Sequence, residues 1–491
     1  MNIPAKIMTS LRTRPHDWFW LVLLIVQGAA ILLWESVGSD IFHGMIRENP
    51  DPLDREFYAS IAAGMRTAML IVLIVSAVGA WINLRFRNAV QLLRVKEGRI
   101  VLTLMAISAI IQLLFMLWLF PPPFSDSLFY IQHADRLFQT GSYRATDGSL
   151  TAFWPVGYPA FLAFLEFLGG DMLLWGRVAN VIFSVAIVYF SWRLFSKELD
   201  RRGRLLLVAV LAFHPILLFG ASPLMTELAF LACMMTALLL LIRRYESQRM
   251  RWLAAIALGL LFGVMAFVRP SGLLIAGAFL AARVFASERA ERPHMPIVAA
   301  AVMLLTLLPW TARNFMILDH VVPVATNGGY NFLMGNHPGA SGGLNFDFSY
   351  PTDENEAVAS RDAYERGLRA IVNNPWDSLL RLPVKLLYSY RRGDATVLWS
   401  VKPVHEKLPH WLLAFFIYSA NLAWYVLVGF GMVALMLGKT HIRARRIRMA
   451  LLWLTGAVFL TIMLYVGGER YVIPLFPLHA FLFTRFFTIR A

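Results

Sequence analysis

The stretch VLTLMAISAIIQLLFMLWLFPPPFSDSLFYIQHADRL, residues 101–137, decides how the whole chain is interpreted. Its first twenty residues are almost wholly apolar, and about 20 such residues are what an α-helix needs to cross a bilayer. Three prolines follow and end the helix, because proline lacks the N–H that a helix interior requires. The stretch therefore predicts a membrane-spanning helix whose end places a charged residue, Asp126, at the membrane surface.

The composition favours a membrane protein throughout the chain. Of the 491 residues, 58% are hydrophobic and only 15% are charged, with a mean hydropathy of +0.60, which is far more apolar than an ordinary soluble protein. The net charge of +15 falls mainly in short loops between apolar runs, so it indicates membrane topology and excludes nucleic acid as a partner. The single cysteine, Cys233, excludes an intramolecular disulfide and a cysteine-based metal site.

Twelve apolar runs are long enough, at roughly 17–25 residues each, to cross a bilayer. The first follows basic residues as a signal peptide would, but it is too long for one and no clear cleavage site precedes Glu35, so we expect a retained helix. The two runs around Arg269-Pro270 could equally form one bent or re-entrant pair. The runs are 17–35, 67–84, 101–120, 172–195, 205–221, 224–242, 252–268, 271–287, 296–312, 411–437, 449–467 and 471–488.

The charge of the loops predicts the orientation of these helices. One alternate set of loops holds 27 of the 45 Lys and Arg residues within 79 residues, and the opposite set holds 15 within 164 residues. Cytoplasmic loops are enriched in Lys and Arg, so we expect the basic loops and both termini in the cytoplasm, and the membrane to be a plasma or bacterial inner membrane. The basic loops are 1–16, 85–99, 193–204, 243–251, 283–292, 439–448 and 485–491, and the opposite ones are 36–66, 121–155 and 313–410.

The predicted helices and loops divide the chain into four parts, in an all-α polytopic membrane protein. Residues 1–99 supply two N-terminal transmembrane helices, and residues 100–312 form a membrane core with a first outer loop at 121–171. Residues 313–410 form an extracytoplasmic, α-rich insertion, and residues 411–491 supply the C-terminal transmembrane helices.

Two segments outside the spans have their own predicted structure. WPVGYPAFLAFLEFLGG, residues 154–170, is too short to span comfortably, so we expect it to lie along the membrane interface. The outer insertion begins with the loop-like ATNGGYNFLMGNHPGASGG. It continues with a helix near residues 355–373 that stops at Asn374-Pro375.

Two acidic residues at predicted outer helix ends have both functional and structural interpretations. Ionisable groups near a membrane are costly, which favours a functional role. Asp126 could cap the helix that begins at SDS, or it could act as a general base, because a carboxylate at an apolar surface binds protons more tightly. Glu227 follows Ser222-Pro223, a good helix start, and an acid in a first turn also favours the helix dipole.

Three arginines share a chemistry that suits a lipid phosphate. Arg269, Arg313 and Arg470 carry planar guanidinium groups, which bind phosphate through paired hydrogen bonds. Arg269 could instead end a helix before a proline, Arg313 could extend from its helix end to water, and Arg470 could form a surface ion pair with Glu469. The glycine-rich segment 327–343 leaves backbone room for a polar ligand, but it is not a P-loop because no GK[ST] follows.

Six blocks, in order along residues 100–490, resemble the GT-C membrane glycosyltransferases. They are SDSLFYIQHADRLFQTGSY, DGSLTAFWPVGYPAFLAFL, TELAF, AFVRPSGLL, LPWTARNFMILDHVVPVATNGGYNFLMGNHPGASGG and GERYVIPLFPLHAFL, of which the TNGGYN and GNHPGASGG pair is the more specific. The chain is most similar to bacterial proteins that resemble dolichyl-phosphate-mannose protein mannosyltransferases and the lipid A aminoarabinose transferase. The resemblance implies a GT-C-like fold and transfer of a sugar from a polyprenyl-phosphate donor on the outer membrane face.

The resemblance also implies roles for individual residues. An acidic residue in the family's first outer loop is the catalytic base, which maps onto Asp126. Ser127 stands where the family often has a second acid, so a divalent metal is left open but not favoured. His133, seven residues after Asp126, could share its helix face and bind such a metal, but no metal ligand is assigned. The donor-phosphate candidates are Arg269, Arg313 and Arg470, and the substrate-binding candidates are Tyr130, Tyr158, Glu227, Asn327, Tyr330, Asn331, Asn336, His337 and Glu469.

The expected chemistry needs few groups. A phosphate-linked sugar has a good leaving group, so one carboxylate to activate the acceptor hydroxyl and cations to bind the departing phosphate suffice. Because no clear second carboxylate stands beside Asp126 as a nucleophile, we expect single displacement with inversion. The expected partners are the polyprenyl-phosphate-linked sugar, a glycan, lipid or protein acceptor, and the bilayer.

Other function classes stay open at this point. A polymerase or ligase would use a lipid-diphosphate-linked glycan in place of the monophosphate donor. A secondary transporter would need a polar site reachable from both sides, but the predicted helix centres carry almost no ionisable residues. A non-enzymatic membrane scaffold would be unimpaired by Asp126→Asn.

Overall fold

The computed structural model describes residues 15–48, 51–86, 96–286, 294–438 and 442–488. Within these ranges the regular structure is helical, and the β-pairing is confined to one isolated bridge between Arg144 and Leu150. Nine helical segments of the described chain are long and apolar enough to cross a membrane. The predicted class, an all-α polytopic membrane protein, is confirmed.

Each of the twelve predicted runs overlaps helical structure, but the runs 205–221, 224–242 and 271–287 correspond to helices of 17 residues or fewer. The run at 205–221 is broken at His214-Pro215, where the His214 ring accepts a hydrogen bond from the Ile216 backbone N–H at 3.2 Å and starts a new short helix. The break at Arg269-Pro270 separates two helices, as expected. The helices that contain or correspond to the runs are α2 (Pro15–Leu33), α4 (Pro52–Phe86), α5 (Glu97–Leu119), α8 (Met172–Phe195), α9 (Arg201–Phe213), α10 (Pro215–Gly220), α11 (Thr226–Ile242), α12 (Gln248–Val268), α13 (Ser271–Ala286), α14 (His294–Leu318), α19 (His410–Met436), α20 (Arg445–Leu464) and α21 (Phe476–Thr488), the last preceded by the 3-10 helix η5 (Glu469–Leu475).

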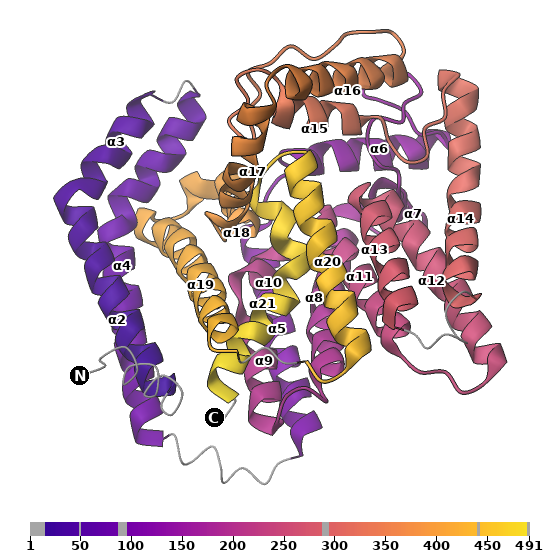
Figure 1. Ribbon diagram of the computed structural model, residues 1–491. Coiled ribbons are helices and arrows are strands. Elements are labelled where there is room, and N and C mark those ends of the chain that lie inside the picture. Colours follow the sequence, from indigo (N-terminus) through magenta and orange to yellow (C-terminus); the bar gives the residue numbers. More distant parts are fainter. Residues whose placement is uncertain (1–14, 49–50, 87–95, 287–293, 439–441, 489–491) are drawn as a thin grey trace.

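The remaining helices gather at one end of the bundle, which we call the Asp126 end. Figure 1 shows α6, α15 and α16 stacked there, whereas α2 begins and α21 ends at the opposite end. The predicted basic loops 1–16, 85–99, 283–292, 439–448 and 485–491 lie wholly or partly outside the described residues. The helices beyond the spans are α3 (Ser39–Glu48), α6 (Asp126–Thr140), α7 (Gly157–Phe167), α15 (Asn327–Asn336), α16 (Glu356–Asn373), α17 (Pro375–Tyr390) and α18 (Ala395–Val401), with the turns η1 (Trp34–Gly38) and η4 (Lys402–Lys407).

The predicted helices at 154–170 and 355–373 are confirmed as α7 and α16. The placement of α7 along the interface stays a prediction. Asn374-Pro375 ends α16 as expected, but α17 begins at once with Pro375 in its first turn, a position that proline favours because the first helical N–H groups have no intrahelical acceptor.

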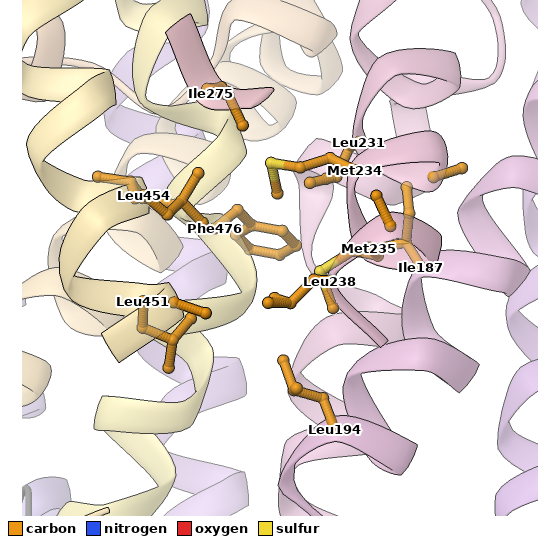
Figure 2. Packing of buried hydrophobic residues seen from close by; sticks show 14 of the residues in the cluster. Ile187, Leu194, Leu231, Met234, Met235, Leu238, Ile275, Leu451, Leu454 and Phe476 are labelled. Carbon is orange, nitrogen blue, oxygen red and sulfur yellow. The ribbon is translucent and has the colours of Figure 1, made fainter. Parts of the chain in front are cut away.

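A large apolar core holds α11 at the centre of the bundle. This helix is apolar on nearly all sides and buried along most of its length, as expected of a helix surrounded by others. Figure 2 shows Met234 and Leu238 of α11 lying toward Phe476, with Leu454 beyond it. The packing fixes the helix that carries Glu227 in its first turn.

Small residues bring other helices together, as is common in membrane proteins. A Cβ on Gly259 of α12 would lie 2.6 Å from the backbone oxygen of Ala299 in α14. On the other side of the bundle, a Cβ on Gly64 of α4 would lie 2.1 Å from the backbone oxygen of His410, where α19 begins. In each of these two helix pairs, the backbones approach too closely for a residue larger than glycine at that position.

Candidate active site

Four charged residues from distant parts of the sequence meet at the Asp126 end. Asp126 is the first residue of α6, Glu227 the second of α11, Arg269 lies between α12 and α13, and Arg470 lies in η5. Arg470 donates to Asp126 Oδ2 from Nη1 at 2.5 Å and to Glu227 Oε1 from Nε at 2.8 Å. Arg269 Nη1 donates to the same Glu227 oxygen at 2.9 Å. We call Asp126, Glu227, Arg269 and Arg470 the charged cluster.

The backbone before α6 explains why Asp126 is free to join the cluster. The three prolines end the preceding helix, and Ser125 takes the positive φ of 56°, which costs a non-glycine residue of the order of 1–3 kcal/mol. Ser125 makes no capping bond with its side chain, and Ser127 Oγ is engaged with the Phe124 backbone. Asp126 therefore directs its carboxylate to Arg470 and not to the end of its own helix.

Glu227 is the buried centre of the charged cluster. Its side chain is 2% exposed, compared with 22% for Asp126. One of its oxygens accepts both arginines, while Oε2 is buried with no hydrogen-bond partner in the described structure. Buried groups stay charged when they are paired with opposite charges. The two carboxylates and two guanidinium groups of the cluster have a net charge of zero. Glu227 lies beneath the two arginines and holds them side by side.

Aromatic rings and a small pocket surround the charged cluster. Tyr130 is buried one helical turn after Asp126, and both burial and the nearby Asp126 carboxylate raise the pKa of Tyr130. The Tyr130 ring packs edge-on against Tyr158 with centroids 5.7 Å apart. Arg269 and Arg470 also line a small pocket, together with Ser271, Thr461 and Tyr471 among others. Both arginine side chains remain slightly exposed, at 12% for Arg269 and 17% for Arg470.

Arg313 makes no contact with the charged cluster among the described residues, although it was predicted with the other arginines. Its Nη1 donates to the Thr151 backbone oxygen at 2.7 Å and its Nη2 to the Tyr143 backbone oxygen at 2.8 Å. Its guanidinium also lies 4.6 Å from the centroid of the Trp310 ring. Arg313 thus fastens the first outer loop to α14.

Glu356 completes this fastening and was not identified from the sequence. Its Oε2 accepts from the Thr151 hydroxyl at 2.7 Å, and its Oε1 accepts from the Ala152 backbone N–H. The first-turn position of Glu356 in α16 was visible in the sequence, but nothing there indicated a partner about two hundred residues away. The outer insertion and the first outer loop are joined at this point.

Glu469 and Arg470 do not pair with each other, contrary to the surface ion pair considered from the sequence. Glu469 Oε1 accepts from Arg391 Nε at 3.1 Å, whereas Arg470 turns to Asp126 and Glu227. Adjacent residues point in different directions because η5 is a tight turn. Glu469 lies at the rim of the site, with Arg391 half-exposed beside it.

The expected loop at the start of the outer insertion is partly wrong, because residues 327–336 form helix α15. Glycine normally disfavours a helix by about 1 kcal/mol, but here it permits close packing. A Cβ on Gly329 would lie 2.2 Å from the Ser360 backbone oxygen, and one on Gly335 would lie 1.8 Å from the Tyr465 backbone oxygen. At these two positions the glycines hold α15 against neighbouring segments and leave no backbone room for a ligand.

The candidate residues on and after α15 form structural contacts that do not reach the charged cluster within the described residues. Asn331 Nδ2 bonds the Asn327 backbone oxygen, and the Tyr330 ring packs on Phe348 and Tyr350. Asn336 links separate segments, because its Nδ2 donates to the Leu464 backbone oxygen and its Oδ1 accepts from Lys385. The His337 ring stacks on Phe348, and its Nδ1 lies 2.7 Å from the Pro338 backbone oxygen.

Lys385 of α17 was also missed from the sequence. It is buried, donates to Asn336 Oδ1 at 2.9 Å and to the Met463 backbone oxygen at 3.0 Å. Burial lowers the pKa of Lys385 to about 8. A lysine on an amphipathic helix normally points to water, so the sequence pattern concealed this contact.

No group of three or more His, Cys, Asp or Glu side chains among the described residues could hold a metal ion. His133, the residue considered for one, stacks on Tyr143 and its Nδ1 lies 2.7 Å from the Arg144 backbone oxygen. The arrangement found at the charged cluster is one of anion-binding arginines held by carboxylates. It suits a ligand that brings negative charge.

One family model matches part of the chain. Residues 154–312 match the dolichyl-phosphate-mannose-protein mannosyltransferase family. The resemblance to this family predicted from the sequence is confirmed for these residues, which include Glu227 and Arg269 but neither Asp126 nor Arg470. No curated protein matches the chain.

Several solved structures are similar to the chain at low identity. The oligosaccharyltransferase of Archaeoglobus fulgidus, in a complex with zinc and sulfate, matches at 15% identity with a TM-score of 0.48, covering 78% of this chain and 48% of that one. The archaeal oligosaccharyltransferase AglB from the same organism, with an inhibitory peptide and a dolichol-phosphate, matches at 15% identity and 0.45, covering 79% and 50%. ArnT from Cupriavidus metallidurans, bound to undecaprenyl phosphate, matches at 14% identity and 0.37, covering 80% and 77%. The chain thus spans about half the length of the oligosaccharyltransferases.

Proposed function

We propose that the protein is a membrane glycosyltransferase that moves a sugar from a polyprenyl-phosphate-linked donor to an acceptor hydroxyl. The observation that carries this proposal is the direct contact of Asp126, Glu227, Arg269 and Arg470, which come from four segments. The family match over residues 154–312 supports the transferase class. We place the reaction on the outer face of a plasma or bacterial inner membrane, with both termini in the cytoplasm, because the sequence predicts the basic loops on the opposite side.

Asp126 is the proposed catalytic base. Its carboxylate takes the proton of the acceptor hydroxyl while the hydroxyl oxygen attacks the anomeric carbon of the donor sugar. The bond from that carbon to the phosphate oxygen breaks, and the polyprenyl phosphate leaves with the electron pair. Asp126 is about one-fifth exposed, which leaves it reachable by an acceptor while the remainder of the cluster is more enclosed.

Arg269 and Arg470 are the proposed ligands of the donor phosphate. Guanidinium groups bind phosphate with several N–H donors, and they stabilise the charge that develops on the leaving group. Arg470 bonds Asp126, so an arriving phosphate competes for this arginine and releases the carboxylate to act as a base. Glu227 positions both arginines through its single shared oxygen.

The other candidates take supporting roles in this proposal. Arg313 and Glu356 hold the first outer loop, which carries Asp126, against the outer insertion. Tyr130 and Tyr158 form the apolar wall behind Asp126. The sugar-binding or acceptor-binding residues are proposed to lie among Glu469, His337 and four residues of α15: Asn327, Tyr330, Asn331 and Asn336.

A lipid and glycan profile of cells tests the function. Cells whose only copy carries Asp126→Asn are compared with wild type and with Asp135→Asn, a control on the same helix whose carboxylate bonds Gln139. We expect Asp126→Asn alone to accumulate a lipid-phosphate-linked sugar and to lose one residue from a glycoconjugate. Unchanged profiles with the protein at its normal level would contradict an enzymatic role, and accumulation of a lipid-diphosphate-linked glycan would favour a polymerase or ligase.

The stereochemistry is tested separately. Single displacement with Asp126 as the base inverts the anomeric carbon, because the described cluster provides a second carboxylate, Glu227, only in a buried position bound to two arginines. NMR spectroscopy of the anomeric proton in donor and product distinguishes the outcomes. A product with the donor's configuration would refute the single-displacement mechanism while leaving the transferase class intact.

A further inference from the structure

Helix α17 (Pro375–Tyr390) carries large apolar side chains outward and the polar Lys385 and Ser389 inward. Trp376, Leu379, Leu380 and Leu387 are 76%, 53%, 70% and 68% exposed, whereas Lys385 on the opposite face is 1% exposed. A helix on the surface of a soluble protein has the reverse arrangement, with apolar residues toward the core. The outward face of α17 is therefore suited to an apolar medium.

The exposed side chains form one continuous stripe. Positions 376, 379, 380, 383 and 387 recur at intervals of three and four residues, which places them on a single face of an α-helix. Position 383 is Pro383, which is also exposed. Single exposed apolar residues are ordinary, but several large ones on one face indicate a surface that contacts another molecule or a membrane.

The inner face fixes the direction of this stripe. Lys385 Nζ bonds Asn336 and the Met463 backbone oxygen, and Ser389 Oγ accepts from the Gly468 backbone N–H at 3.0 Å. Rotating α17 to bury the stripe would leave these buried polar groups unpaired, which is costly for each group. The stripe therefore stays outward.

The position of α17 indicates what covers the stripe. α17 packs against η5 and against α20, a helix long and apolar enough to cross a membrane. In its last two turns α20 exposes Leu460 and Leu464, so the lipid-facing surface of the bundle reaches the helix on which α17 rests. Trp376, the most exposed of the four, is of a residue type enriched at membrane interfaces.

We propose that α17 is an interfacial helix whose stripe of Trp376, Leu379, Leu380 and Leu387 is immersed among the lipid acyl chains of the leaflet at the Asp126 end. The stripe anchors the outer insertion to the bilayer. Because the inner face of α17 holds residues 463–468, which directly precede η5, the same contact links the bilayer surface to the segment that carries Arg470. The lipid contact itself does not depend on the proposed transferase activity.

Fluorescent labelling of single cysteines tests the proposal on the full-length protein in nanodiscs. Cys233, the natural cysteine, is replaced by alanine, and a polarity-sensitive dye is attached at Leu380→Cys or Leu387→Cys. Leu464→Cys on α20 is the lipid-facing reference, and Phe346→Cys, which is 67% exposed in the outer insertion outside α17, is the water-facing control. Quenching is measured with nitroxide-labelled phospholipids and with aqueous iodide.

Lipid nitroxides are expected to quench the dyes at 380 and 387 as strongly as the dye at 464, and several-fold more than the dye at 346. Iodide is expected to quench the dye at 346 more strongly than the other three. Quenching at 380 and 387 that follows the pattern at 346 would overturn the proposal. Protection of both dyes from both quenchers would also overturn it, because it would show a protein partner, such as a second copy of the chain, on the stripe. Size-exclusion chromatography confirms that each variant is folded, and Trp376→Cys replaces either position that fails.

Discussion

Replacing Glu227 by glutamine should destabilise the protein more than any other single change in the charged cluster. Glutamine keeps the shape of the side chain but removes the charge that two arginines share. The change removes the negative charge from the acceptor of two hydrogen bonds, of 2.8 and 2.9 Å, which an amide oxygen can accept only as weaker bonds. Removing one partner of a buried ion pair costs about 3–5 kcal/mol, so we expect a loss of about 3–5 kcal/mol in the free energy of unfolding.

Asp126→Asn is the matched comparison. Asp126 is 22% exposed and accepts one bond from Arg470, so its replacement should cost about 1.5–3 kcal/mol at most, before solvent screening reduces it. Unfolding of the purified variants in mixed micelles with increasing sodium dodecyl sulfate, followed by fluorescence of the 15 tryptophans, measures both losses. The order Glu227→Gln above Asp126→Asn is the expected result.

A double-mutant cycle identifies the cause. If Glu227→Gln acts by leaving Arg269 without a partner, the pair Glu227→Gln with Arg269→Gln should lose less stability than the two single changes added together. The reasoning is refuted if Glu227→Gln costs less than about 1 kcal/mol, the value typical of an exposed pair. It is also refuted if the double change is simply additive, because the two charges would then not be coupled.

Three further predictions concern neighbouring parts of the molecule. Asp126→Asn should lower kcat roughly 10²–10⁴-fold, as expected for loss of a general base. It should also lower the KM for the donor, because Arg470 is released from Asp126 and can bind the phosphate; separate measurement of kcat and KM tests both effects. Gly335→Ala should cost about 1–3 kcal/mol, because its Cβ would lie 1.8 Å from the Tyr465 backbone oxygen, whereas Gly456→Ala, which has open space, should not destabilise; thermal unfolding compares the two. Burial lowers the pKa of Lys385 to about 8, so above that pH the unfolded chain binds more protons than the folded one. The free energy of unfolding should therefore rise from a pH of about 8 toward the ordinary lysine pKa of about 10.4. Lys385→Met should flatten this rise in denaturation curves taken between pH of about 8 and about 9.5.

Helix-level features followed from the sequence because their causes are local. An apolar run of membrane length becomes a helix in lipid, since no other arrangement satisfies its backbone, and the prolines at residues 121–123 and Pro270 separate helices because of their missing N–H groups. The sequence could also place Asp126, Glu227 and Arg470 at the same level across the membrane, because alternate helix ends share one side.

The position of each helix around the bundle could not be predicted in the same way. The sequence predicted Arg313 at a helix end like Arg269, but the position of a helix around the bundle depends on packing between distant segments. Propensity misled at α15, where Gly329 and Gly335 indicated a loop and close packing overrides their cost in a helix. Lys385 and Glu356 escaped detection because their partners, Asn336 and Thr151, lie on other segments.

The charged cluster divides its work by burial. Glu227, enclosed and bound to two arginines, has no surface left for a substrate, so its contribution is to hold Arg269 and Arg470 in place before any ligand arrives, and such preorganisation lowers the cost of binding a charged group. Asp126, less buried and held through one arginine alone, is the carboxylate that a ligand can free. Two acids of similar chemistry therefore serve different ends because one lies beneath the arginines and the other beside them.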